Sequence, residues 1–170
     1  MNKPATTPSK KSHIRLVELL REDASPLPSM VARDRATALR DLQRESFFQP
    51  ASDTDGPYVL RLSIEENRLV FRIQNAQERE LPMLVLALKP YKRIIKDYFM
   101  IMHSYEEALR DGKPSRIEAI DMGRRALHNE GASLLQERLG DKIKMDRPTA
   151  RRLFTLICVL HASKTALWRG

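Results

Sequence analysis

The most unusual group of side chains in this sequence combines an acid, a guanidinium and an imidazole at helical spacing: Asp121, Arg124 and His128. Residues three or four apart lie on the same side of a helix. Arg124 and His128, one turn apart, could bind a phosphate-like anion, while Asp121 orients a basic partner. An imidazole also titrates near neutral pH and could transfer a proton. These three residues are therefore our candidate ligand-binding site.

A purely structural role is the alternative for the same residues. On a helical wheel they fall inside an arc that is otherwise mostly apolar, together with Arg138, and the apolar members are Ile117, Ile120, Leu127, Gly131, Leu134, Leu135 and Leu139. Ionisable groups on a buried stripe are costly unless they have partners. In this interpretation Asp121 pairs with Arg124 or Arg125. His128 is then a neutral imidazole bonded to a backbone carbonyl of the sheet or the last helix.

Other reactive groups give little support for catalysis. The single cysteine, Cys158, lies in the apolar run 153–160, where a thiol usually behaves as a small buried hydrophobe. The four histidines are far apart in sequence, and neither a Cys-x-x-Cys nor a His-x-x-x-His pair occurs. We identify no nucleophile, metal site or cofactor motif. Whether the protein is an enzyme stays open, and no cofactor is expected.

The formal net charge of +8 is concentrated at the two ends of the chain. Residues 1–21 carry five lysines and arginines against one acid, and residues 142–170 carry seven against one. Three functions follow as hypotheses. We favour a small non-catalytic binding or regulatory protein that acts through a protein partner. The alternatives are a nucleic-acid-associated protein that uses its basic ends, and an anion or small-ligand binder, or an enzyme, centred on the third helix.

Composition predicts one domain in the cytoplasm. Hydrophobic residues make up 42% and charged residues 31% of the 170 residues, which is typical of globular proteins. Residues 1–11 are basic and almost without apolar side chains, so we expect a disordered tail followed by a single α+β domain over 12–170. No run of 18 apolar residues and no secretory h-region occur, so no membrane partner is expected.

Hydrophobic periodicity predicts the elements that would position the site. Alternation of apolar residues indicates an antiparallel three-stranded meander at about 58–64, 69–74 and 81–88, with a fourth strand near 13–18. Helical spacing indicates helices at about 29–44, 90–110, 115–139 and 148–162, the last apolar on all sides. The segment 49–57, rich in Pro, Asp and Gly, is expected to be a loop.

Local signals define the ends of these elements. Asn67 suits the turn between two strands, because asparagine tolerates positive φ. Ser115 and Glu118 have the spacing of a capping box, and Asp146 is expected to start the last helix. Gly131, inside the third helix, predicts close packing by another part of the backbone. Lys89, Lys92, Arg93 and Lys96 are expected to form a solvated helix face opposite the buried Tyr91.

Three segments resemble a small family of uncharacterised proteins from alphaproteobacteria. They are LRLSIEENRLVF at 60–71, IEAIDMGRRALHNEG at 117–131 and ARRLFTLICVLH at 150–161. The resemblance covers the chain from about His13 onward, and the second segment is long enough to be fairly specific. This chain departs from the family pattern in having a longer end after His161. The family has no assigned activity, cofactor or catalytic residue, so the resemblance implies no function.

Overall fold

Alternating apolar side chains build the central sheet of the computed structural model, which describes residues 11–22 and 26–165. The sheet contains β1 (Ile14–Leu19), β3 (Tyr58–Glu65), β4 (Arg68–Gln74) and β5 (Leu84–Ala87), in the order β1-β3-β4-β5. β3, β4 and β5 pair antiparallel, as predicted. Glu66 and Asn67 have φ values of 52° and 61° and form the β3–β4 turn. The expected α+β class is confirmed, and the expected antiparallel meander is confirmed only for these three strands.

The first strand departs from a simple meander. β1 pairs parallel with β3, with Val17 opposite Leu60. Helix α1 (Ser29–Arg44) lies between these strands in the chain and carries it back to the end of the sheet where β1 began. Parallel neighbours require such a crossover, whereas a short turn would have given an antiparallel pair.

The prediction that 49–57 is a loop was wrong at its start. Gln49 and Pro50 belong to β2 (Phe48–Pro50), which pairs antiparallel with β6 (Ile143–Met145) in a separate two-stranded sheet. Three-residue strands carry no periodic signal of their own, and this pair depends on a contact between distant parts of the chain. The strand expected at 81–88 is shorter than predicted, because β5 begins only at Leu84, after Pro82.

All four expected helices are present: α1, α2 (Lys92–Asp111, after a short 3-10 helix Lys89–Tyr91), α3 (Pro114–Leu139) and α4 (Arg147–Thr165). The predicted capping box of Ser115 and Glu118 was wrong. α3 begins at Pro114, one residue before Ser115, because proline suits the first helical position. No side chain caps this end of the helix. Asp146 does cap α4, since its Oδ1 accepts the Thr149 N–H at 3.0 Å.

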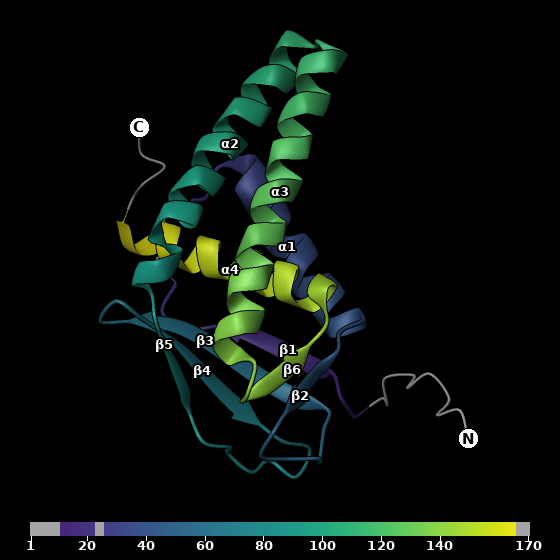
Figure 1. The fold of residues 1–170 in the computed structure, drawn as a ribbon, viewed down its shortest axis with the longest axis vertical. Helices are drawn as coiled ribbons and strands as arrows, with labels where there is room; N and C mark the ends of the chain where they lie inside the picture. The colour runs from purple at the N-terminus through teal and green to yellow at the C-terminus, as the bar shows by residue number, and fades with distance from the viewer. Residues whose placement is uncertain (1–10, 23–25, 166–170) are drawn as a thin grey trace, which may run out of the picture.

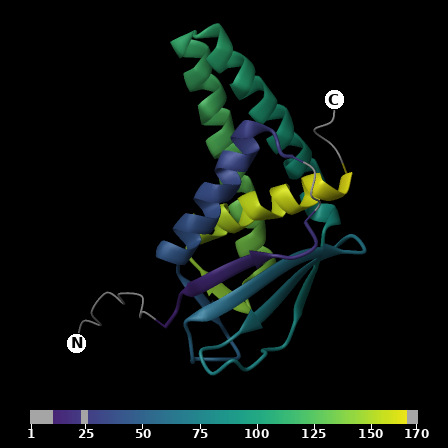
Figure 2. The same cartoon turned by 180° about the vertical axis from the view of Figure 1, so that it is seen from behind.

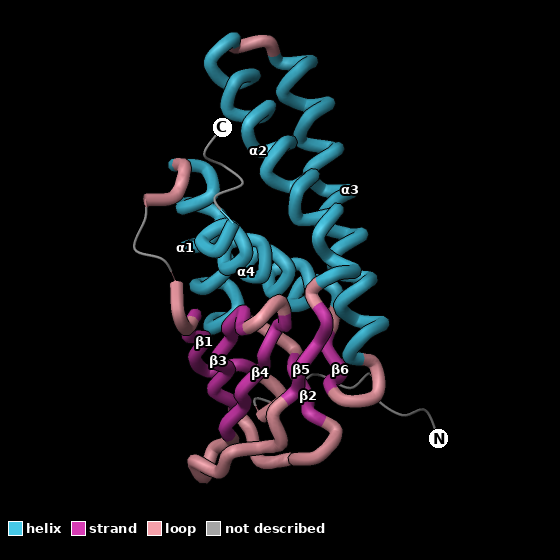
Figure 3. The backbone as a smooth tube through the Cα atoms, turned by 90° about the vertical axis from the view of Figure 1, so that its left-hand side faces the viewer, coloured by secondary structure: helices cyan, strands magenta, loops and turns pink. Residues whose placement is uncertain are grey.

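The helices gather on one side of the sheet (Figures 1 and 3). α4 runs between the sheet and the α2–α3 pair, and α1 lies beside it when the molecule is viewed from behind (Figure 2). Every residue from Leu153 to Leu160 is buried, as expected for a helix packed on several sides. The inward side chains of β3, among them Leu60 and Leu62, complete the same core. The core therefore lies around α4.

α2 and α3 form an antiparallel hairpin whose far end projects beyond the rest of the fold (Figures 1 and 2). Gly112 joins the two helices with a left-handed φ of 68°, which favours glycine. Large apolar side chains are exposed along this hairpin at Met100, Leu109 and Met122. Within the described ranges, no helix combines the length and the apolar character needed to cross a membrane.

Candidate functional site

A cleft of about 440 Å³ lies where α1, α3 and α4 meet. Small-molecule sites typically occupy 300 to 1,000 Å³, so the cleft has roughly the volume of a small ligand site. Six of its eleven lining residues are charged, namely four arginines and two carboxylates: Arg124, Arg125, Arg151, Arg152, Asp34 and Asp41. The imidazole of His128 and the hydroxyl of Thr155 lie between these charges. The wall therefore carries more cationic than anionic groups.

The close approach of α3 and α4 forms one side of the cleft. A Cβ atom on Gly131 would lie 2.5 Å from the ring of Phe154. The glycine therefore allows α3 to cross α4 directly over that ring. Close packing at this position was predicted, but the neighbour is the Phe154 side chain and not another backbone. Because Thr155 and Arg151 lie on the same helix as Phe154, this crossing also brings them next to His128.

Asp34 connects three helices through its carboxylate. Its Oδ2 accepts a hydrogen bond from the Tyr98 hydroxyl of α2 at 2.9 Å, and its Oδ1 lies 3.4 Å from the Arg124 guanidinium of α3. Burial, followed by the nearby Asp34 charge, raises the pKa of Tyr98, which therefore stays protonated and donates. The Asp34 side chain is only 17% exposed, so these partners replace much of its contact with water.

Arg124 is held from several sides. Besides Asp34, its guanidinium pairs with Asp121 at 3.2 Å and lies 5.3 Å from the centroid of the Tyr105 ring, a cation–π distance. The second oxygen of Asp121 pairs with Arg125 at 3.0 Å. The internal pairing of Asp121 is thereby observed with both of its candidate partners. Two carboxylates compensate the charge of Arg124, which is fixed in the wall of the cleft.

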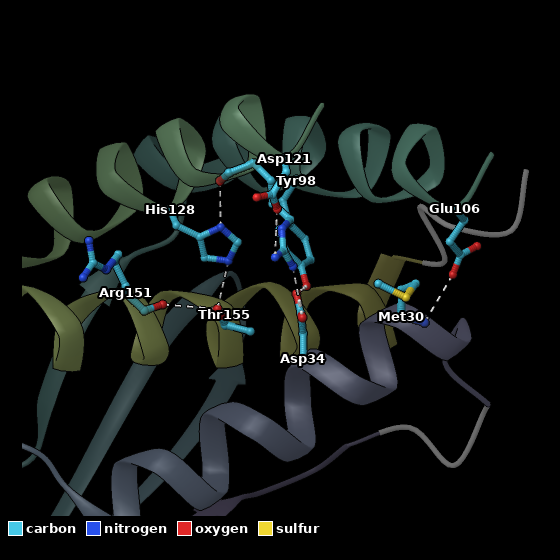
Figure 4. A network of polar contacts seen from close by, with 9 residues as sticks. Met30, Asp34, Tyr98, Glu106, Asp121, His128, Arg151 and Thr155 are labelled. Atoms are coloured by element: carbon cyan, nitrogen blue, oxygen red, sulfur yellow. Dashed lines mark hydrogen bonds and ion pairs between the residues drawn. The ribbon is translucent and has the colours of Figure 1, made fainter. Parts of the chain in front are cut away.

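His128 is bonded through both ring nitrogens (Figure 4). Nδ1 lies 2.8 Å from the Arg124 carbonyl oxygen, to which it can only donate, and Nε2 lies 3.1 Å from Oγ1 of Thr155. Burial lowers the pKa of His128, against a smaller opposing effect of its bond to the Arg124 carbonyl. A neutral imidazole is therefore favoured, as predicted. Its carbonyl partner, however, belongs to its own helix and not to the sheet or α4.

Arg151 and Arg152 differ from the other two arginines of the cleft because their partners are uncharged. Arg151 donates to the Asn129 side-chain oxygen at 2.9 Å, and Arg152 donates to the Glu45 carbonyl at 3.1 Å. Among the residues that the structure describes, no carboxylate lies within ion-pair distance of either guanidinium. Each guanidinium has five N–H donors, so most of theirs remain available for another acceptor.

The structure brings the three predicted site residues together, but in different roles. Arg124 and His128 line the cleft, whereas Asp121 lies behind it and pairs with two arginines. Arg138, which the helical wheel placed on the same arc, is exposed to solvent. The helical-wheel prediction assumed that one face of α3 is buried along the whole length of the helix. In fact the first half of α3 forms part of the projecting hairpin, and only the second half reaches α4 and β6.

Sequence reasoning missed Asp34, Thr155 and the Arg151–Arg152 pair. The sequence did contain a pattern that could have indicated Asp34 and Thr155. Asp34 lies at helical spacing from the buried Val31 and Ala38, and Thr155 is the polar side chain within the apolar run 153–160. The arginine pair had been counted only as part of a basic terminus. Its position in the cleft depends on how α4 crosses α3, which no local pattern specifies.

Potentially reactive groups near the cleft are not activated. Cys158 is fully buried, and burial, together with the Asp34 charge, raises the pKa of its thiol. A raised pKa disfavours the thiolate that would act as a nucleophile or metal ligand. Within residues 11–22 and 26–165, no group of three or more His, Cys, Asp or Glu side chains is arranged to bind a metal ion.

Comparison with known proteins gives a consistent family match. The model of the uncharacterised protein family UPF0262 matches residues 11–163. A UPF0262 protein of Paramagnetospirillum magneticum is 50% identical over 145 residues, which cover 85% of this chain and 92% of that protein. One from Mesorhizobium japonicum is 47% identical over 166 residues, covering 96% of this chain and 99% of that protein. No solved structure matches the chain.

Proposed function

The chain belongs to the uncharacterised protein family UPF0262, and we propose that it is a non-catalytic binding protein that holds a small organic oxyanion, such as a phosphate monoester, in the cleft between α1, α3 and α4. The observation that carries this proposal is the pair Arg151 and Arg152. Both guanidiniums line the cleft, and neither has a carboxylate partner among the described residues.

The charge balance of the cleft supports an anionic ligand. Arg124 and Arg125 are matched by Asp34 and Asp121, and Asp41 lies beside Arg40 at 3.3 Å. This leaves the positive charges of Arg151 and Arg152 uncompensated. Two adjacent guanidiniums offer several N–H groups in fixed planes, which suits the oxygens of a phosphate or carboxylate.

The arginines are also held in place before a ligand arrives. Neutral acceptors fix one side of Arg151 and Arg152, while an acid and an aromatic ring fix Arg124. Ordered side chains lose less entropy on binding, which raises affinity without adding contacts. Because the cleft is much larger than one phosphate group, the oxyanion is expected to be attached to an organic body.

Thermal denaturation of wild-type protein with inorganic phosphate, adenosine monophosphate and citrate tests the proposal. Sodium chloride at equal ionic strength separates specific binding from screening. At a ligand concentration of roughly 100 times Kd, binding stabilises the folded state by about 2.7 kcal/mol, so Tm should rise measurably for the ligand that fits. The double variant Arg151→Gln/Arg152→Gln should lose this rise.

Arg110→Gln is the control, because it makes one such Arg→Gln substitution at an exposed helical position near the hairpin tip. It should keep the full ligand-induced rise in Tm. Arg124→Ala should instead lower Tm without any ligand, since it leaves the largely buried Asp34 carboxylate without its ion-pair partner. Absence of a rise with any of the three anions, or an equal rise in the double variant, would refute anion binding in this cleft.

Two sequence-based hypotheses stay predictions beside this proposal. Nucleic-acid binding through the basic ends would weaken steeply as salt is added, and it would not depend on Arg151 and Arg152 alone. A protein partner is supported by the exposed Met100, Leu109 and Met122 on the α2–α3 hairpin. The protein-partner hypothesis uses residues outside the cleft, whereas the nucleic-acid hypothesis shares Arg151 and Arg152 with it.

A further inference from the structure

β5 forms one outer edge of the four-stranded sheet, and we propose that it pairs antiparallel with β5 of a second copy of this chain, so that two sheets join into one. In the order β1-β3-β4-β5, β5 has a neighbour on one side only. An unpaired strand edge presents a row of free backbone N–H and C=O groups to another chain. The inference is independent of the cleft and of its ligand.

The opposite edge of the sheet is protected, which makes β5 distinctive. On β1, the Ile14 N–H donates to the Ser46 hydroxyl at 3.0 Å, and the Val17 N–H donates to Oε1 of Gln43 at 3.0 Å. Gln43 lies in the last turn of α1 and Ser46 follows the helix, and both side chains cover the β1 edge. The structure places no comparable side-chain acceptor against β5 among the residues that it describes.

Hydrogen-bond alternation identifies the groups that face outward on β5. The Leu88 N–H donates to the Asn67 carbonyl across the β4–β5 pair. In an antiparallel ladder, bonding direction alternates along each strand, so Leu84 and Leu86 also direct their backbone groups toward β4. The backbone N–H and C=O groups that point to the free side belong to Val85 and Ala87, and to Met83 just before the strand.

The side chains along this edge are apolar and exposed. Residues 81–88 read LPMLVLAL and contain no charged or hydrogen-bonding side chain. Met83 is 54% exposed and Val85 42% exposed. Natural edge strands usually carry lysines, bulges or inward charges that prevent pairing with other chains, and here only Pro82 near the start has that effect.

Charge complementarity selects a second copy in antiparallel orientation. With Val85 opposite its own copy, Met83 faces Ala87 of the other chain, so the apolar residues match about a two-fold axis. Exposed Glu78 and Glu80 precede β5 with exposed Arg79 between them, so this segment carries one net negative charge. Exposed Lys89 and Lys92 follow β5 and carry two positive charges. These two glutamates and two lysines form no ion pair among the described residues. Antiparallel pairing brings the acidic start of one strand beside the basic end of the other, and parallel pairing would bring like charges together.

A four-residue strand buries little surface compared with the roughly 1,200 to 2,000 Å² of stable interfaces, so the dimer should be weak. Sedimentation velocity over a range of micromolar concentrations should show a reversible shift from monomer toward dimer. Val85→Lys should abolish it, because two lysines would meet at the two-fold axis. Met122→Lys, at a 64% exposed residue of α3, is the control and should still associate.

A charge swap tests the orientation of the two strands. Glu80→Lys or Lys89→Glu alone should weaken association, and the double variant Glu80→Lys/Lys89→Glu should restore it. Circular dichroism verifies that each surface variant remains folded. Protein that stays monomeric throughout, or a dimer that persists in Val85→Lys, overturns the proposal. A dimer lost only in Met122→Lys would place the contact on the α2–α3 hairpin and likewise overturn it.

Discussion

Thr155 has one hydroxyl proton and two acceptors within reach of it. Its Oγ1 lies 3.2 Å from the Arg151 carbonyl and 3.1 Å from Nε2 of His128. With a neutral imidazole whose Nδ1–H bonds the Arg124 carbonyl, Thr155 must donate to Nε2 and leave the Arg151 carbonyl. With a protonated imidazole, Nε2–H donates to Thr155, which can then donate to Arg151. The charge state of His128 therefore sets the direction of this hydrogen bond.

His128 should make folding stability depend on pH. Burial lowers its folded pKa below the usual value of about 6.5, so the unfolded chain binds the proton more tightly. Stability is therefore fully present above about pH 6.5 and declines as the pH falls toward the lower folded pKa. Urea denaturation at about pH 8 and about pH 5 should show a smaller decline for His128→Gln than for wild type.

His13 and His161 contribute in the same direction, because burial lowers the pKa of both. Some decline should therefore remain in His128→Gln. His103→Gln, at a side chain that is 69% exposed, is the matched control. If both variants declined as much as wild type, His128 would not be the buried neutral group described above.

Two buried tyrosines should respond in opposite ways to loss of the hydroxyl. The Tyr91 side chain is fully buried, and its hydroxyl has no hydrogen-bond partner among the described residues. Tyr91→Phe removes that cost and should raise the free energy of unfolding by about 1 kcal/mol. Tyr98→Phe removes the donor to Asp34 and should lower it by about 1 to 3 kcal/mol. Urea denaturation measures both, and a destabilised Tyr91→Phe would reveal an internal partner for that hydroxyl.

The crossing of α3 over α4 depends on a single missing methyl group. Gly131→Ala would normally favour a helix by about 1 kcal/mol, but its Cβ would lie 2.5 to 2.6 Å from three carbons of the Phe154 ring. Phe154 is fully buried and cannot move into solvent. We expect a loss of about 1 to 3 kcal/mol in chemical denaturation, as for other overpacked cores.

Gly140→Ala provides the comparison at the end of the same helix. Gly140 is exposed, has a helical φ of −48°, and its added Cβ would approach only the backbone of its own last turn, at 3.3 Å. This variant should lose clearly less stability than Gly131→Ala. Equal losses would mean that α3 tolerates neither alanine for a reason other than the Phe154 contact.

Elements whose residues repeat at a regular period could be predicted from sequence, and elements that depend on distant partners could not. The alternation that includes Leu60 and Leu62 predicted a strand, and the apolar run 153–160 predicted a buried helix, because burial follows these patterns. Phe48 and Met145 form a strand pair only because the fold brings them together. The candidate site follows the same division: Arg124 and His128 share one helix and were found, whereas Asp34 reaches them from α1.

At the scale of the whole molecule, the basic C-terminal region is not a separate tail. Lys144, Arg147, Arg151 and Arg152 belong to β6 and α4, and two of these arginines line the cleft. The excess of positive charge that suggested a nucleic-acid partner therefore lies partly in a folded helix. The net charge indicates which kind of partner a protein attracts, but the fold determines where on the surface the charged side chains lie.

The start of the chain should be dispensable. Residues 1–10 lie outside the described residues, and the expected tail 1–11 overlaps them. A truncation that begins at Ser12 keeps the Ser12 carbonyl, which accepts the Phe48 N–H at 2.9 Å. Its Tm should lie within a few degrees of the full chain.

A second truncation locates the boundary of the domain. Starting at Ile14 removes both that acceptor and the His13 carbonyl, which accepts the Tyr58 N–H at 2.9 Å. Two buried strands then lose backbone partners at their first residues, so Tm should fall clearly below that of the Ser12 truncation. A large loss already at Ser12 would show that the preceding residues belong to the folded domain.

The pairing of β2 with β6 also has a consequence for synthesis on the ribosome. β2 is translated more than ninety residues before its partner, and α1 likewise waits for α4, against which it packs. A nascent chain that ends before residue 143 exposes the apolar surfaces of α1 and the sheet that α4 will cover. Folding of this domain therefore completes only after β6 and α4 have left the exit tunnel, and until then these surfaces are a natural target for chaperones.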